Sequence, residues 1–194
     1  YRMLRPDDTI AVAVSGGKDS VSLLHILTRI ERDFPGARVV AITINEGISE
    51  YRSEAVKIAR RNCEKLDVEQ VVLSFKELYG YELDDIVRIT RKRKRLTPCS
   101  YCGVLRRKAL NAAAKGAGAS KLATAHNLDD EVQTIFLNIV HGDVMRIARV
   151  EPAIEEVVPK FVQRVKPLCE IPENEIALTH TLMKSSSKQL HALT

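Results

Sequence analysis

The most constraining feature of the sequence is an apolar run that leads directly into a glycine-rich turn. Residues 10–14 (IAVAV) have the length and composition of a buried strand, and SGGKDS follows at 15–20. The next stretch, VSLLHILTRI, has helical periodicity. A strand, a turn with two adjacent glycines and a helix together predict the first unit of an α/β domain with an anion site at the turn.

The same alternation continues along the chain. We predict strands at 10–14, 38–44, 68–74 and 121–124, with a short one at 162–166, and helices at 18–33, 51–66, 102–116, 128–140 and 172–183. This order indicates a doubly wound α/β fold, in which a mostly parallel sheet has helices on both faces. Residues 142–163 read as a long loop. We expect one catalytic domain over 1–184 and a C-terminal tail over 185–194.

The turn at 15–20 has the chemistry of a phosphate site. Two glycines let successive N–H groups converge on an anion, and the following helix adds the positive end of its dipole. Lys18 adds a cation, and the flanking serines add hydroxyl groups. The spacing matches neither the Walker loop nor the dinucleotide-binding GxGxxG pattern. The alternative is a tight turn in which Asp19 and Ser20 only cap a helix.

This hexapeptide, placed after a first strand, resembles the signature loop of the PP-loop (N-type) ATP pyrophosphatases. The resemblance implies that ATP is bound and attacked at its α-phosphate, with release of pyrophosphate. It also implies that Asp19 helps to hold Mg²⁺, since that ion prefers oxygen ligands. The residues that would hold the triphosphate are Ser15, Gly16, Gly17, Lys18, Asp19 and Ser20.

A second segment, TPCSYCGVLRRKALN (97–111), contains Cys99 and Cys102 at a spacing that can present both sulfurs to one metal. Half of a structural zinc site or a redox pair would have the same spacing. Together with ATAHNLDDEVQTIFLN (123–138) and VKPLCEIPENEIAL (165–178), this segment resembles the tRNA 2-thiouridine synthetases of archaea and the eukaryotic cytosol.

That resemblance implies an enzyme that adenylates the C2 oxygen of a tRNA uridine, at the wobble position, and replaces it with sulfur. The sulfur donor would be sulfide or a ubiquitin-like sulfur carrier protein. The resemblance further implies a [4Fe-4S] cluster held by Cys99, Cys102 and Cys169. A zinc site completed by His126 or His180 and a metal-free persulfide are the alternatives. Cys63 reads as a buried small hydrophobe on a helix.

The remaining candidate residues follow the strand ends. Thr43 is expected near the nucleotide, because it lies close to the carboxyl end of a predicted strand. For His126 and Asp130 the resemblance implies a role near the nucleotide or target base, with Asp130 handling Mg²⁺ or a proton. The alternative is that both only cap the helix predicted from residue 128. The expected catalytic set is Lys18, Asp19, Asp130, Cys99, Cys102 and Cys169.

The basic segment RITRKRKRL (88–96) is expected to contact the tRNA backbone, although such a run is also typical of a solvated face. The formal net charge of +5 agrees with an acidic partner. Stacking on bases would use Tyr79 or Tyr101. The predicted tRNA contacts are Arg91, Lys92, Arg93, Lys94, Arg106 and Arg107.

Other readings of the whole chain are a PP-loop ligase similar to lysidine synthetase and a zinc-containing RNA-binding module without catalysis. Neither explains the sequence as completely, since a ligase has no use for three cysteines and an RNA-binding module has none for the Gly-Gly-Lys-Asp turn. We expect a cytoplasmic protein without a membrane segment, because no apolar run approaches the ~20 residues of a membrane span. Nothing in the sequence opposes a homodimer.

Overall fold

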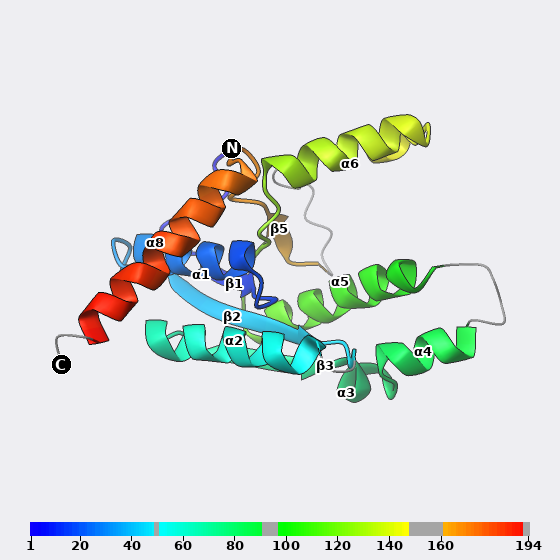
Figure 1. Cartoon of the computed structure of the whole chain (residues 1–194), viewed down its shortest axis with the longest axis horizontal. Coiled ribbons are helices and arrows are strands. Elements are labelled where there is room, and N and C mark those ends of the chain that lie inside the picture. The colour runs from blue at the N-terminus through cyan, green and yellow to red at the C-terminus, as the bar shows by residue number, and fades with distance from the viewer. Residues whose placement is uncertain (49–50, 91–96, 148–160, 192–194) are drawn as a thin grey trace.

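In the computed structural model the described residues are 1–48, 51–90, 97–147 and 161–191. They form a five-stranded sheet in which all neighbouring strands are parallel. Helices cover both faces of this sheet (Figure 1), so the predicted doubly wound α/β fold is confirmed.

The secondary structure follows the predicted alternation. The strands are β1 (Thr9–Ala13), β2 (Arg38–Asn45), β3 (Gln70–Ser74), β4 (Lys121–Ala123) and β5 (Gln163–Val165). The helices are α1 (Lys18–Glu31), α2 (Tyr51–Leu66), α3 (Phe75–Tyr79), α4 (Leu83–Thr90), α5 (Pro98–Gly116), α6 (Leu128–Val140), α7 (Val144–Ile147) and α8 (Glu173–His191). None of the helices in this described part of the chain is both long and apolar enough to cross a bilayer.

The strand order β3-β2-β1-β4-β5 makes β1 the centre of the sheet. The chain first builds outward from β1 through β2 to β3, and then returns to the other side of β1 to add β4 and β5. The direction of winding therefore changes between β1 and β4, where Val12 pairs with Ala123. In open parallel sheets, ligands bind outside the carboxyl ends of the strands at such a switch point.

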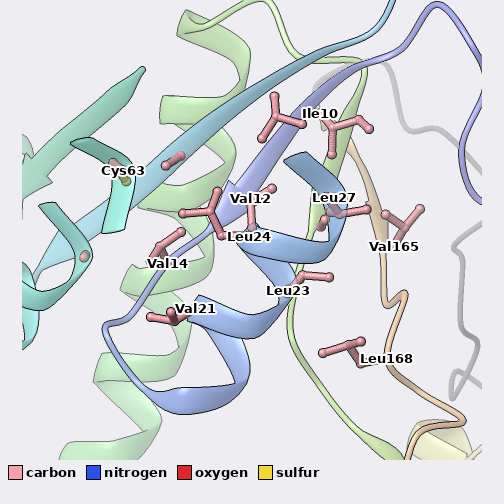
Figure 2. Packing of buried hydrophobic residues seen from close by; sticks show 14 of the residues in the cluster. Ile10, Val12, Val14, Val21, Leu23, Leu24, Leu27, Cys63, Val165 and Leu168 are labelled. Carbon is pink, nitrogen blue, oxygen red and sulfur yellow. The ribbon is translucent and has the colours of Figure 1, made fainter. Parts of the chain in front are cut away.

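One face of the sheet packs against α1, α2 and α8. Figure 2 shows Ile10, Val12 and Val14 of the first strand and its end lying against the apolar side of α1, which contributes Leu23 and Leu24. Cys63 of α2 belongs to the same cluster and is only 2% exposed, which confirms its predicted role as a buried small hydrophobe.

The opposite face packs mainly against α5. Ala11, Ile42 and Leu122 of the sheet contact a row of small residues on this helix, which includes Ala109 and Ala113. Small side chains let the helix approach the sheet closely, so residues on its neighbouring face are brought near the strand ends.

The structure changes several predicted boundaries. Helix α5 begins at Pro98, four residues earlier than predicted, because Thr97 is its N-cap and accepts a hydrogen bond from the Ser100 N–H at 3.3 Å. The cysteine pair is therefore helical. Helix α8 continues past the predicted domain boundary at 184, and residues 185–191 belong to it. Within the predicted loop at 142–163, α7 forms a short helix, and residues 148–160 lie outside the described part of the chain.

Candidate functional site

The turn between β1 and α1 is held in one conformation by its own side chains and by α2. Gly16 has φ +87°, and a Cβ atom there would lie 2.3 Å from the carbonyl oxygen of Ala55, so only glycine fits. The Ser20 hydroxyl donates to the Gly17 carbonyl at 2.9 Å and accepts from the Ser15 N–H at 3.1 Å.

The first turn of α1 has no capping side chain. Gly17 is its N-cap and makes no side-chain cap hydrogen bond. The alternative in which Asp19 or Ser20 caps this helix is therefore not what the structure shows. An uncapped N-terminus beside a nest of backbone N–H groups has the geometry of an anion site.

Lys18 is held by two carboxylates. Its Nζ lies 3.0 Å from Asp19 Oδ1 and 2.5 Å from Glu173 Oε1 at the start of α8. Although partial burial opposes the effect, hydrogen bonds to Glu173 and Asp19 raise the pKa of Lys18. Gly16 and Lys18 line a cavity of about 500 Å³ between α1, α2 and α8, so the lysine is near the loop yet faces this smaller hollow.

A larger cavity of about 1050 Å³ lies at the switch point. One wall is the turn after β1, where Ser15, Gly17, Asp19 and Ser20 face it. The other walls come from the segment after β4, from α5 and from β5, which are separate in sequence. The volume is at the upper end of the ~300–1,000 Å³ typical of small-molecule sites.

The segment after β4 brings His126 and Asp130 to the cavity. Asp130 closes a capping box with Asn127: its Oδ2 accepts from the Asn127 N–H at 3.1 Å, and Asn127 Oδ1 accepts from the Asp130 N–H at 2.9 Å. The capping alternative for Asp130 is thus observed, and the box also fixes the carboxylate at the cavity wall.

His126 is exposed at the cavity and its Nδ1 lies 3.0 Å from the Thr124 hydroxyl. Desolvation by the surrounding protein atoms, reinforced by the positive charges of Arg164 and Lys166, lowers the pKa of His126. This shift favours the neutral imidazole over the charged one.

Helix α5 brings two of the predicted arginines to the same cavity. Arg106 Nε donates to the fully buried Glu46 Oε1 at 2.5 Å, and its Nη2 lies 3.1 Å from Cys102 Sγ. Arg107 lies one residue further along the helix, and its Nε donates to the Gly103 carbonyl at 3.0 Å. Because Glu46 fixes Arg106, the guanidinium bridges the end of β2, the cysteine and the cavity wall.

Sequence reasoning missed Arg164 and Glu46. Arg164 of β5 lines the cavity, although nothing in its sequence neighbourhood separates it from the other cations. Glu46 directly follows β2, and its pairing with Arg106, which is 60 residues away in the sequence, has no local sequence signal.

Some of the predicted site residues do not line the large cavity. Thr43 is fully buried in β2, where its hydroxyl accepts from Gln70 Nε2 at 2.8 Å, so it does not reach the cavity. Tyr79 donates to the Leu105 carbonyl at 2.9 Å and packs edge-on against Phe75, which makes it a structural contact between α3 and α5. The predicted tRNA contacts Arg91, Lys92, Arg93 and Lys94 lie outside the described residues.

The cysteines have suitable chemistry for an iron–sulfur cluster, because all four are free thiols. Cys99 is exposed on the first turn of α5, and Cys169 is buried in the segment that connects β5 and α8. Burial and the charges of Glu170 and Glu131 raise the pKa of the Cys169 thiol. Within the described ranges, no group of three or more His, Cys, Asp or Glu side chains is arranged to hold a metal ion.

Several known proteins are similar to this chain. The tRNA 2-thiolation protein NcsA of Haloferax volcanii is 38% identical over 176 residues, which are 88% of this chain and 54% of that protein. The cytoplasmic tRNA 2-thiolation protein 1 of Chlamydomonas reinhardtii is 38% identical over 179 residues, which are 91% of this chain and 49% of that protein. The chain thus spans about half the length of the curated relatives it matches.

Solved structures extend the comparison. The U34-tRNA thiolase NcsA from Methanococcus maripaludis with its [4Fe-4S] cluster superposes with a TM-score of 0.82 at 36% identity, over 93% of this chain and 59% of that one. An NH3-dependent NAD synthetase from Campylobacter jejuni has a TM-score of 0.57 at 14% identity, which shows a shared fold alone.

A protein-family model described as a PP-loop domain matches residues 2–186. The matched range includes the turn after β1, the segment after β4 and both cavity-facing arginines of α5. The family model covers nearly the whole chain, and we conclude that the chain belongs to the PP-loop domain family.

Proposed function

We propose that this chain activates a tRNA uridine for 2-thiolation, by transferring AMP from ATP to the C2 oxygen of the wobble uridine. The observation that carries this proposal is the single cavity of about 1050 Å³ in which the turn after β1, the His126–Asp130 segment and the arginines of α5 meet. The similar thiolation proteins of Haloferax and Methanococcus support the choice of substrate.

The turn after β1 would bind the triphosphate through its backbone. The uncapped start of α1 and the N–H groups around Gly17 supply donors that are already fixed by Ser20. Asp19 lines the same cavity and would hold Mg²⁺ beside the phosphates. Lys18 would exchange Asp19 and Glu173 for phosphate oxygens, which would neutralise the charge that develops on pyrophosphate.

The opposite wall would position the uridine. A neutral His126 can donate or accept one hydrogen bond without repelling a cation, and Asp130 is fixed by its capping box. These groups would orient the C2 oxygen toward the α-phosphate. In the reaction this oxygen forms a bond to the α-phosphorus, the bond to the bridging oxygen of pyrophosphate breaks, and sulfur then displaces AMP.

Sulfur delivery would involve the cysteines near α5. Cys102 lies in contact with Arg106, which lines the cavity, so this thiol is next to the proposed reaction site. We propose sulfide or a ubiquitin-like carrier protein as the sulfur source. Among the described residues, no three ligating side chains are arranged to hold a metal ion, and iron analysis of the cysteine variants tests whether a cluster is bound.

A tRNA substrate also suggests which basic residues bind it and where in the cell the reaction takes place. We propose that Arg91, Lys92, Arg93 and Lys94 contact the tRNA backbone together with the arginines of α5. A cytoplasmic location agrees with this substrate and with the name of the Chlamydomonas relative.

We also propose that the chain forms a homodimer through α6. This helix carries no charged side chain from Val132 to Val140, and Phe136, Leu137 and Val140 are exposed. An uncharged apolar face can pair with its own copy, and a symmetric contact would bury both faces. Analytical ultracentrifugation should show a dimer that Phe136→Glu converts to a monomer, whereas a monomeric wild type would contradict this proposal.

The activity is tested with ATP, Mg²⁺, sulfide and an unmodified tRNA transcript that carries uridine at position 34. Pyrophosphate release should require the transcript, and the product should contain 2-thiouridine. A transcript with cytidine at position 34 is the matched control and should give neither product. Equal pyrophosphate release with both transcripts would contradict the proposed substrate.

A further inference from the structure

The large cavity has a positively charged wall that is formed by residues of α5 and β5. Arg107 of α5 and Arg164 of β5 both line it, and they come from elements far apart in the sequence. No carboxylate of the described residues lies within ion-pair distance of either guanidinium. Two cations that share one cavity repel each other, so their placement favours a bound anion.

The fold fixes these two side chains beside each other. Asn111 Oδ1 of α5 accepts from the Val162 N–H at 2.8 Å, which ties the helix to the start of β5. Arg107 lies one helical turn before Asn111, and Arg164 lies two residues after Val162. A helix that crosses between parallel strands runs antiparallel to them, so both steps lead toward the carboxyl edge of the sheet.

Strand register gives the same placement. Arg164 pairs with Leu122 of β4, and Leu122 belongs to the core cluster under α5. Residues that pair in register share a face of the sheet, so Arg164 lies on the α5 face. Burial, followed by the nearby charge of Arg107, lowers the pKa of Arg164, and the charge of Glu131 only partly opposes this shift, which agrees with two cations held close together.

An exposed aromatic residue, Phe161, lines the same cavity. Phe161 lines the cavity and is 56% exposed, although a phenylalanine without a partner is usually buried. Leu110, Leu122 and Val162 are apolar residues that line the same cavity. An exposed aromatic ring next to paired cations is the combination that binds a base and its phosphate.

We propose that Phe161, Arg107 and Arg164 form a subsite for one nucleotide of single-stranded RNA, with the base stacked on Phe161 and a backbone phosphate held by the two arginines. This subsite rests on the proposed function, since it seats the tRNA in the cavity that holds ATP. ATP has a single phosphate chain, which the turn after β1 already suits, so a second phosphate site in the same cavity calls for a second ligand.

The experiment measures binding of the unmodified tRNA transcript by fluorescence anisotropy between about 50 and 200 mM salt. Arg107→Gln and Arg164→Gln should each reduce the slope of log K against log salt by about 0.7, the value for one single-strand phosphate. Phe161→Ala should weaken binding by about 5- to 150-fold at an unchanged slope, as expected for one lost base stack. ATP binding should stay within about twofold of wild type in all three variants.

Matched controls come from exposed residues away from the cavity. Arg60→Gln on α2 and Phe34→Ala after α1 remove the same chemical groups and should leave both the affinity and the slope unchanged. Variants of the subsite that behave like these controls would overturn the subsite. Loss of ATP binding with an unchanged RNA slope would overturn it as well, because the arginines would then serve the triphosphate.

The outcome is separable from that of the proposed function. Wild-type protein that binds the transcript and forms no 2-thiouridine would contradict the thiolation proposal, while the slopes of the variants would still decide the subsite. Conversely, thiolation by variants that bind RNA with wild-type slopes would retain the function and reject the subsite.

Discussion

The contact between Arg106 and Glu46 gives a prediction of stability that the structure makes quantitative. Glu46 is completely buried at the end of β2, and Arg106 Nε donates to it at 2.5 Å. Replacing Arg106 with methionine keeps the length and helix propensity of the side chain and removes the charge. The buried carboxylate then loses a charged hydrogen-bond donor.

The expected loss follows from the exposure of the two partners. Breaking a fully buried ion pair costs about 3–5 kcal/mol, because one charge is left in the interior. The Arg106 side chain is 45% exposed, so water can take part of its place. We therefore expect Arg106→Met to lower the free energy of unfolding by about 2–3 kcal/mol, near the range for hydrogen bonds to charged groups.

Urea denaturation followed by circular dichroism measures this change. With a slope of about 2 kcal/mol per molar urea, the midpoint should fall by about 1–1.5 M. Arg107→Met is the matched control, since the neighbouring arginine contacts only a helix carbonyl among the described residues and should lose less than about 1 kcal/mol. Equal losses in the two variants would refute the reasoning, because burial of Glu46 would then contribute nothing.

Three further predictions address ATP use, iron and thiol reactivity. Lys18→Ala and Asp19→Ala should abolish tRNA-dependent pyrophosphate release, and wild-type release rates would contradict the PP-loop role. Each should change the free energy of unfolding by less than about 1 kcal/mol, because the side chains are partly exposed and their ion pairs are with each other and with Glu173. Iron content after anaerobic reconstitution tests the predicted three-cysteine cluster. A cluster held by Cys99, Cys102 and Cys169 would lose its iron in each of their alanine variants and keep it in Cys63→Ala, and full iron content in Cys169→Ala would reject this ligand set. Burial, with a smaller effect of Glu64, raises the pKa of the Cys63 thiol to about 11, so only about 0.1% is thiolate at pH 8. Its alkylation by iodoacetamide should be slow there and accelerate about tenfold per pH unit toward pH 11, and labelling at pH 8 as fast as that of exposed Cys99 would show that Cys63 is accessible and ionised.

The sheet and its first turn were predictable because their determinants are local. The IAVAV run, the two glycines and the periodic helix after them fall within about 20 residues, and each follows from strand, turn or helix chemistry. The start of α5 also has a local signal, because Thr97 is an N-cap residue and Pro98 a first-turn proline. The prediction placed the start at residue 102 because it relied on the hydrophobic periodicity, which begins there.

The walls of the cavity depended on contacts that no local pattern contains. Arg164 reaches the site because β5 pairs with β4 and Asn111 ties it to α5, and Glu46 meets Arg106 across 60 residues of sequence. Thr43 does not reach the cavity because both faces of β2 are buried at this point and its hydroxyl accepts a hydrogen bond from Gln70 Nε2. Residue type decided none of these cases, because only the tertiary fold determines which side chains face the cavity.

The close approach of Gly16 to the Ala55 carbonyl has a consequence for the speed and selectivity of nucleotide capture. A loop wedged against α2 has already lost its backbone freedom when the protein folds, so a nucleotide does not bear that entropic cost when it binds. Such a loop works as a rigid template and accepts only those phosphate chains whose spacing matches its N–H groups. Any conformational change during the reaction would then involve the other walls of the cavity, while the turn after β1 keeps its position.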